Sequence, residues 1–228
     1  MIVTIINYGL SNLLSISRAV RNLGHEPLIT NLSGDVSVAD IIILPGVGAF
    51  KDGMDGLSRL GLVAPLREKA RAGVPILAIC LGMQMLFDES DEFGVHEGLG
   101  LIPGRVERIP DLDVRGGRQR VPHVSWNGLY PVTGASFHSA LMRGVRPGDE
   151  VYFIHSFEVK PLRDEHASAI AYYGGRRVCA AAESGNVFGT QFHPEKSGAV
   201  GLGILANFLS SVRRDAVVSS PADQDMHG

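Results

Sequence analysis

Three residues of this chain, Cys80, His193 and Glu195, have the types and spacing that support nucleophilic catalysis by a thiol. A cysteine nucleophile needs a base that takes its proton and later returns it to a leaving amine, and imidazole is the usual base. A carboxylate then fixes the tautomer of that base. Pro194 favours an extended backbone at position 193, so the His193 and Glu195 side chains should leave the chain on the same face. The pattern predicts a nucleophile, a base and an orienting carboxylate, provided that the fold brings Cys80 beside His193.

The sequence around Cys80 favours a nucleophile placed at a sharp strand-to-helix turn. The continuous apolar run 75–79 before it predicts a buried parallel strand, and the apolar segment 83–87 after it predicts a helix. A helix N-terminus stabilises a thiolate, and Gly82 suits a turn too tight for a side chain. The alternative is that Cys80 is inert core, as most lone cysteines are, and we expect that packing role for Cys179.

The glycine-rich segment 45–48, Pro-Gly-Val-Gly, supplies candidate hydrogen-bond donors for a negatively charged reaction intermediate. It follows the apolar run 41–44, so it should lie at the same carboxyl edge of the sheet as the cysteine. We expect the backbone at Gly46 and Val47, together with the N–H group of Leu81, to form an oxyanion hole. The segment lacks the Lys-Ser/Thr pair of a phosphate-binding loop.

Residues 1–90 alternate apolar runs with amphipathic segments, which is typical of an α/β fold. The expected strands are 2–7, 27–30, 41–44 and 75–79, and the expected helices are 13–23, 57–72 and 83–87. This order predicts an open, mostly parallel sheet with helices on both faces.

The second half of the chain predicts antiparallel strands added to that core. Short strands are expected at 99–102, 105–109, 121–124 and 151–154, a hairpin at 168–182 that turns at Gly174-Gly175, a strand at 187–192 and a helix at 198–212. We predict a single domain over 1–213, followed by a disordered tail over 214–228.

Composition excludes several classes of function. The net charge of −3 gives no basic field for nucleic acid, and no apolar run is long enough to span a bilayer. The N-terminus has no secretion signal, and the two cysteines do not make a disulfide framework, which predicts a cytoplasmic protein with reduced thiols. No histidine, cysteine or carboxylate cluster has the spacing of metal ligands, so no metal is expected.

Together these motifs resemble the class I (triad) glutamine amidotransferases, and among them the glutaminase subunits of imidazole glycerol phosphate synthases. The resemblance covers residues 2 to about 211 and is carried by the segments 45–50, 80–84, 121–127, 152–156 and 186–197. This chain departs from the usual family pattern at Asn7, Ser11 and Ser125, where aspartate, glycine and glycine are usual. None of these positions belongs to the triad.

The resemblance implies that the chain hydrolyses glutamine to glutamate and ammonia without a cofactor. Cys80 would form a glutamyl thioester, His193 would act as acid and base, and Glu195 would orient His193. Gln84 and the backbone of His155-Ser156-Phe157 would hold the amino-acid end of the substrate.

The resemblance also implies a partner that receives the ammonia. In the family this is a (β/α)₈ cyclase subunit, which makes imidazole glycerol phosphate and an aminoimidazole carboxamide ribonucleotide in histidine biosynthesis. His123, Trp126, Asn127 and Tyr152 match family segments that face this partner or the ammonia passage. The alternative pathway is amidation of a surface sugar by a different synthase.

Two other hypotheses remain at the level of sequence, a catalytically inactive binding protein and a thiol peptidase of the same sheet architecture. An intact set of nucleophile, base and carboxylate disfavours the first, and Gln84 with the run 187–197 disfavours the second. We further expect weak activity without the partner, because the loop at 46–48 would be completed only on docking.

Overall fold

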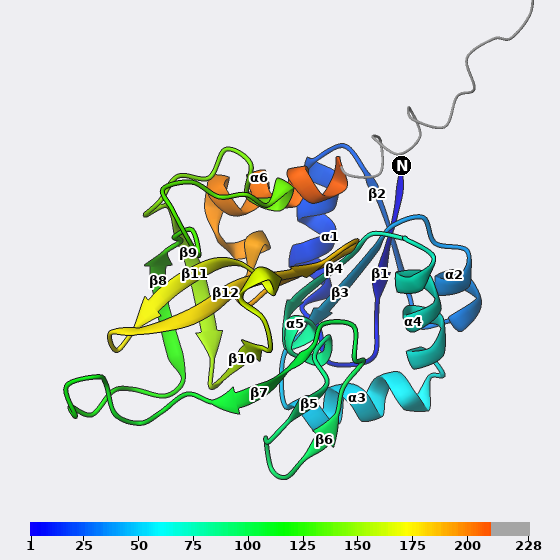
Figure 1. Cartoon of the computed structure of the whole chain (residues 1–228). Helices are drawn as coiled ribbons and strands as arrows, with labels where there is room; N and C mark the ends of the chain where they lie inside the picture. The colour runs from blue at the N-terminus through cyan, green and yellow to red at the C-terminus, as the bar shows by residue number, and fades with distance from the viewer. Residues whose placement is uncertain (211–228) are drawn as a thin grey trace, which may run out of the picture.

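A seven-stranded sheet forms the centre of the protein (Figure 1). The structure is a computed structural model, and it describes residues 1–210. The strand order is β11-β12-β13-β4-β3-β1-β2, and the five strands from β13 to β2 are mutually parallel. The bounds are β1 Ile2–Ile6, β2 Glu26–Thr30, β3 Ile42–Gly46, β4 Ile76–Cys80, β11 Ala167–Tyr173, β12 Arg176–Ser184 and β13 Val187–Thr190. The predicted α/β class with a mostly parallel sheet is confirmed.

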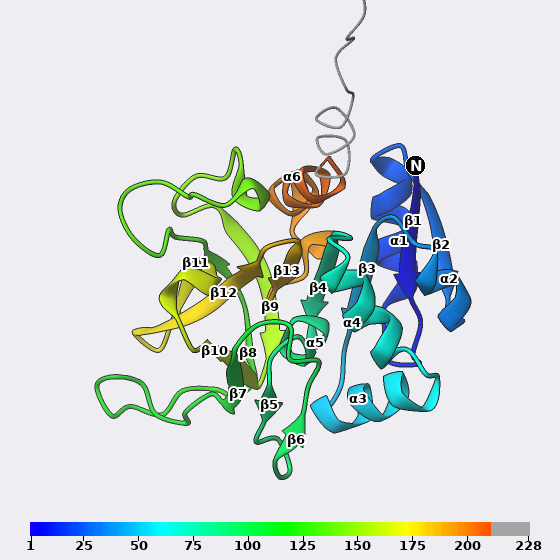
Figure 2. The same cartoon turned by 45° about the vertical axis from the view of Figure 1, so that its right-hand side comes forward.

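Helices cover both faces of this sheet because its central strands are apolar on both sides. Along β3 and β4, Ile42 and Ala78 face one core and Ile43 and Ile79 face the other, and all are buried. The first core is closed by α2 Ser33–Ser37, α3 Phe50–Arg59, α4 Val63–Arg71 and α5 Leu81–Met85, and the second by α1 Leu13–Asn22 and α6 Gly198–Leu209. Figure 2 shows α4 beside the central strands, with α3 below it, and α6 above β13.

Two smaller sheets accompany the central sheet. One has the order β10-β7-β5-β6, and the other pairs β8 with β9. Their bounds are β5 Glu89–Ser90, β6 His96–Glu97, β7 Gly104–Arg108, β8 His123–Gly128, β9 Glu150–His155 and β10 Phe157–Pro161. Short 3₁₀ turns occur at η1 Ala140–Met142, η2 Asp164–His166 and η3 Pro194–Lys196.

Several predicted elements need correction. The single helix expected over 57–72 is two helices, α3 and α4, separated at Gly61, which has a left-handed φ of +64°. No strand forms at 99–102; instead the N–H groups of Leu99 and Leu101 donate to the carbonyls of Met85 and Leu86. That segment therefore satisfies the open C-terminus of α5, which local pattern could not reveal.

Other elements were missed or shifted. The short helix α2 and the strand β10 were not predicted, and β3 continues through Pro45 instead of stopping there. The hairpin at Gly174-Gly175 is confirmed, because both glycines have positive φ between β11 and β12. The expected tail at 214–228 and the last residues of the predicted terminal helix lie outside the described residues. Within residues 1–210, no helix has the length and apolar content to cross a membrane.

Candidate active site

Cys80 occupies a strained turn between β4 and α5. Its backbone has φ 55° and ψ −110°, a conformation that non-glycine residues rarely adopt. Its register partner on β3 is Gly46, and a Cβ atom at that glycine would lie 2.8 Å from the Gly82 nitrogen. A Cβ atom at Gly82 would overlap the carbonyl oxygen of Leu44. The turn therefore needs glycine at both positions, and it presents the sulfur at the edge of the sheet.

His193 and Glu195 form a buried hydrogen-bonded pair beside this turn. The imidazole Nδ1 lies 2.9 Å from the Glu195 Oε1, and both side chains are about 3% exposed. His193 itself is extended as predicted, but the backbone then enters the 3₁₀ turn η3, so the extended geometry expected as far as Glu195 is wrong. Since Nδ1 donates to the carboxylate, Nε2 is the nitrogen left to exchange a proton with a reacting group.

The electrostatics of His193 favour its protonated form. Burial lowers the pKa of His193, but its interactions with the Cys80 sulfur and with Glu195 raise it by more, to about 9. Its Nε2 atom has no hydrogen-bond partner among the described residues. Catalytic hydrogen bonds are often long before substrate binds, so an unpaired Nε2 beside the thiol fits an acid–base group at rest.

Gln191, whose contacts the sequence did not predict, links the Cys80 sulfur to the side chain of Gln84. Gln191 is fully buried, and its Nε2 donates to the Cys80 sulfur at 3.7 Å. Its Oε1 accepts a hydrogen bond from the Gln84 Nε2 at 3.1 Å. The thiol itself lies 3.7 Å from the carbonyl oxygen of Ile154. Gln191 lies inside the motif that ends at His193, but nothing in its spacing indicated this contact.

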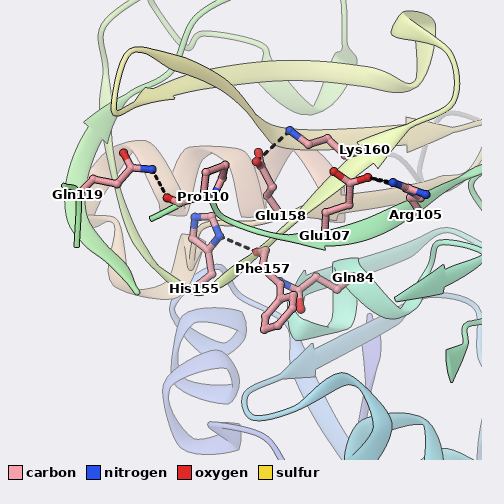
Figure 3. A network of polar contacts seen from close by, with 9 residues as sticks. All are labelled: Gln84, Arg105, Glu107, Pro110, Gln119, His155, Phe157, Glu158 and Lys160. Atoms are coloured by element: carbon pink, nitrogen blue, oxygen red, sulfur yellow. Dashed lines mark hydrogen bonds and ion pairs between the residues drawn. The ribbon is translucent and has the colours of Figure 1, made fainter. Parts of the chain in front are cut away.

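The predicted substrate-binding residues come together around the carbonyl of Phe157. This oxygen accepts from the Gln84 Nε2 at 3.0 Å and from the His155 Nδ1 at 2.8 Å, and Figure 3 shows the two side chains on either side of it. The same figure shows Glu158, the next residue on β10, paired with Lys160 at 2.9 Å. The carbonyl of Phe157 at the start of β10 is thus held by two side chains, those of Gln84 and His155.

A cavity of about 300 Å³ contains these groups, and we call it the reaction cavity. It is lined by Val47, Gly48, Cys80, Leu81, Gln84, Glu92, Pro122, Ile154, His155, Ser156, Phe157 and His193. Burial lowers the pKa of His155 to about 3, so this side chain is neutral and contributes position instead of charge. Within residues 1–210, no group of three or more His, Cys, Asp or Glu side chains is placed to hold a metal ion.

Glu92 is a lining residue that sequence reasoning missed. Its Oε2 accepts a hydrogen bond of 2.6 Å from the Phe50 N–H at the start of α3, and the side chain is buried. Burial raises the pKa of its carboxyl group. In the sequence it belongs to the acidic stretch 88–92, which looks like a solvated loop. Only the fold shows that one carboxylate of this stretch turns inward to the cavity.

The predicted oxyanion donors differ in their availability. Leu81 is the first residue of α5, where backbone N–H groups have no partner within the helix. Val47 is 39% exposed, and its N–H group donates to the carbonyl of Leu10 at 2.9 Å. Gly48, which has φ +109°, follows it. We call residues 46–48 the oxyanion loop, and in this structure its Val47 donor is engaged outside the reaction cavity.

The residues predicted to face a partner occupy the hairpin-like pair β8 and β9. Trp126 is 50% exposed and its ring lies 6.0 Å from that of Tyr152. Asn127 donates to the carbonyl of Tyr172 at 2.9 Å. His123, in contrast, is fully buried, and its Nδ1 lies 3.0 Å from the His155 Nε2. Trp126 is therefore at the surface with the half-buried Tyr152 beside it, whereas His123 is buried and contacts His155 of the reaction cavity.

Ser125, one of the departures noted in the sequence, joins the same polar group. Its hydroxyl lies 2.8 Å from the His123 Nε2 and donates to the Asn127 side-chain oxygen. Burial lowers the pKa of His123. The substitution is thus accommodated by hydrogen bonds between strand neighbours and does not reach the sulfur.

A family model described as glutamine amidotransferase class-I matches residues 4–212. Curated relatives are similar over almost the whole chain. "Imidazole glycerol phosphate synthase subunit HisH 1" of Legionella pneumophila (strain Lens) is 42% identical, covering 91% of this chain and 98% of that protein. "Imidazole glycerol phosphate synthase subunit HisH" of Geobacillus sp. (strain WCH70) is 45% identical, covering 91% and 96%.

Solved structures share the fold at low identity. A structure described as a glutamine amidotransferase has a TM-score of 0.69 at 17% identity and covers 92% of this chain and 98% of its own. PurLQS from Thermotoga maritima has a TM-score of 0.67 at 21% identity and covers 92% and 97%.

Proposed function

This chain belongs to the class I glutamine amidotransferases, and from that premise we propose that it is the glutaminase subunit of an imidazole glycerol phosphate synthase in histidine biosynthesis. The observation that carries the proposal is the buried His193–Glu195 pair beside a cysteine at a strained strand-to-helix turn. The names of the relatives favour this pathway over the amidation of a surface sugar.

In the first half of the reaction the Nε2 atom of His193 takes the proton of the Cys80 thiol, and the sulfur attacks the side-chain amide of glutamine. A carbon–sulfur bond forms, and the carbonyl oxygen becomes an oxyanion. When this intermediate collapses, the carbon–nitrogen bond breaks and His193 transfers the proton on Nε2 to the departing nitrogen. Ammonia leaves, and a glutamyl thioester and a neutral imidazole remain. The raised pKa of His193, about 9, supports this step because the ring holds the proton taken from the sulfur until the nitrogen departs.

In the second half His193 acts as the base. Its Nε2 takes a proton from water, the resulting hydroxide attacks the thioester carbon, and the carbon–sulfur bond breaks. Glutamic acid leaves and ionises, and the proton on His193 returns to the departing sulfur, which restores the starting state. Glu195 holds the ring through Nδ1 in both halves, which keeps Nε2 directed at the reacting groups.

The amino-acid end of the substrate is recognised at the wall formed by Gln84, Glu92 and the segment 155–157. Both amide protons of Gln84 are taken by Phe157 and Gln191, so its oxygen is the group left to accept from a substrate ammonium. The carboxylate of Glu92 adds a negative charge to the same cavity. Backbone groups of residues 155–157 hold the substrate carboxylate.

The partner is a (β/α)₈ cyclase subunit that docks over the exposed Trp126 and the half-buried Tyr152 and receives ammonia from the reaction cavity. Docking also turns the oxyanion loop so that the Val47 N–H leaves Leu10 and enters the cavity beside Leu81. Free chain and complex thus differ by one oxyanion donor, which is worth on the order of 10²–10³ in kcat.

The experiment follows nitrogen from glutamine. The chain is combined with a (β/α)₈ cyclase subunit of an imidazole glycerol phosphate synthase and the ribonucleotide substrate of that cyclase, and it is given amide-¹⁵N-glutamine in a medium of unlabelled ammonium. We expect glutamate release and ¹⁵N in the imidazole product. Glutamate release without label in that product rejects the assigned pathway, whereas no glutamate release with or without the cyclase rejects the glutaminase proposal itself.

A further inference from the structure

The hydroxyl group of Tyr8 is buried at the base of the oxyanion loop without a hydrogen-bond partner. Tyr8 is 2% exposed, and its oxygen has no partner among the described residues. An unpaired buried hydroxyl is unfavourable, and phenylalanine would fill the same space without this cost. Among the described residues, the hydroxyl group therefore has no hydrogen-bond acceptor in the resting structure.

The neighbours of Tyr8 place this hydroxyl against the loop. A Cβ atom added to Gly46 would overlap the Tyr8 oxygen, so the hydroxyl lies directly over the Gly46 backbone. On the other side, a Cβ atom at Gly56 of α3 would lie 3.2 Å from the Tyr8 ring, so the helix packs closely on the ring. The hydroxyl is thus fixed between α3 and the oxyanion loop, and Gly46 is opposite Cys80 in the sheet.

The charge state of the phenol suits a donor. Burial, with a further contribution from Cys80, raises the pKa of Tyr8 far above its usual value. The group keeps its proton at any working pH, and a neutral phenol both donates and accepts hydrogen bonds.

Turning the Gly46–Val47 peptide creates a need for such a donor. At rest the Val47 N–H donates to the Leu10 carbonyl at 2.9 Å. When the peptide plane turns over, its N–H and C=O groups exchange directions, so the Gly46 carbonyl oxygen would leave its present place and meet the Leu10 oxygen. Two acceptors repel each other, so the carbonyl group of Gly46 in the turned loop needs a hydrogen-bond donor close to Gly46.

We infer that the Tyr8 hydroxyl donates to the Gly46 carbonyl oxygen in the turned loop and so stabilises the state in which Val47 serves the oxyanion. Tyr8 is then a positioning residue, because it acts through the loop and does not touch substrate. The inference rests on the proposed function in one respect, namely that the loop turns during glutamine hydrolysis.

The test compares Tyr8→Phe with wild type in two measurements. In the complex with the cyclase, we expect kcat for glutamate release to fall about tenfold with little change in KM, as for the loss of one hydrogen bond made only in the active loop. In the free chain, we expect the Val47 amide proton to exchange more slowly with solvent in Tyr8→Phe, because the turned loop is less populated. The melting temperature should not fall, since the resting hydroxyl has no partner.

Ser168→Ala is the matched control. Its hydroxyl is also buried and unpaired, but it lies on β11, away from the oxyanion loop, so it should change neither kcat nor Val47 exchange. Unchanged kcat together with unchanged or faster Val47 exchange in Tyr8→Phe overturns the inference and leaves the glutaminase intact. Slower Val47 exchange in a chain that releases no glutamate supports the role of Tyr8 in the loop and rejects the proposed function.

Discussion

His193 and Val47 line the same reaction cavity, but their hydrogen bonds are used in different ways. His193 is 2% exposed, and its Nδ1 is already bonded to the carboxylate that its chemistry requires. Val47 is 39% exposed, and its N–H is bonded to Leu10, away from the cavity. In the proposed mechanism, the contact that orients the base is therefore formed at rest, whereas the oxyanion donor is not yet in place.

The difference follows from where each residue lies in the fold. The base belongs to the motif after β13, which pairs with β4 in the middle of the sheet, so moving it would disturb the core. The oxyanion loop follows β3 at the sheet edge, and one hydrogen bond holds its donor. In the proposed mechanism the partner acts on the loop, because turning one peptide there should disturb fewer contacts than moving the base.

The largest expected effect comes from removing the nucleophile. Cys80→Ala should lower kcat for glutamate release by several orders of magnitude, since no other group can form the thioester. Cys179→Ala is the control, because that thiol is buried at β12 and burial raises its pKa to about 12. Comparable losses in both variants, measured with the cyclase present, would contradict the assignment of Cys80.

Removing the charge of the orienting carboxylate should have the next largest effect. Glu195→Gln should lower kcat by about 10²–10⁴, because the ring loses its fixed tautomer. The pKa of His193 should fall from about 9, because Glu195 is one of the groups that raise it. An imidazole NMR titration measures this shift, and an unchanged pKa would show that the carboxylate does not act on the ring.

The raised pKa of His193 also makes the free energy of unfolding depend on pH, and this contribution decreases as pH rises. The pKa of folded His193, about 9, lies above the ordinary value of 6.5. Its contribution to the free energy of unfolding is therefore complete below pH 6.5 and is lost as pH rises to about 9. In Glu195→Gln the pKa of folded His193 should be lower, so the contribution should be lost at a lower pH. Urea unfolding at a series of pH values measures this change.

Removing the N–H group of residue 47 tests the proposed role of the oxyanion loop. Val47→Pro has no N–H group at this position, so the rate in the complex should fall by about 10²–10³. Val47→Ala keeps the donor and should retain most of the rate. If both variants hydrolyse glutamine equally well with the cyclase bound, the oxyanion is stabilised elsewhere.

The smallest effect concerns the rigidity of the nucleophile turn. Gly82→Ala should lower the free energy of unfolding by about 1–3 kcal/mol, because the new Cβ atom would overlap the Leu44 carbonyl. Gly203→Ala lies in α6 with nothing within 4 Å of the added Cβ atom and should stabilise by up to about 1 kcal/mol. Urea unfolding distinguishes them, and equal stabilities would mean that the turn adapts.

The sequence predicted the structure best where the residues of one short segment determine both the local fold and the candidate chemistry. The run 75–84 indicated a strand, a nucleophile and a glycine turn, and the structure has β4, Cys80 and Gly82 in those places. The predicted family and fold are confirmed by the family model and the structural relatives. The residue roles remain predictions, which the substitutions above test.

What sequence could not predict depends on contacts between distant segments. Glu92 enters the cavity because it caps α3, 42 residues away, and Gln191 reaches Cys80 across 111 residues. The Val47–Leu10 bond is likewise a contact between loops. None of these has a periodicity or a local motif, so only the assembled fold reveals them.

The most direct test of the difference between His193 and Val47 is the kcat for glutamate release at saturating glutamine, measured for the free chain and for the chain saturated with the cyclase subunit. Because the base is ready and one oxyanion donor is missing, we predict a rate in the complex higher by about 10²–10³. Equal rates in the two states would contradict the claim that the active site is incomplete until the oxyanion loop turns.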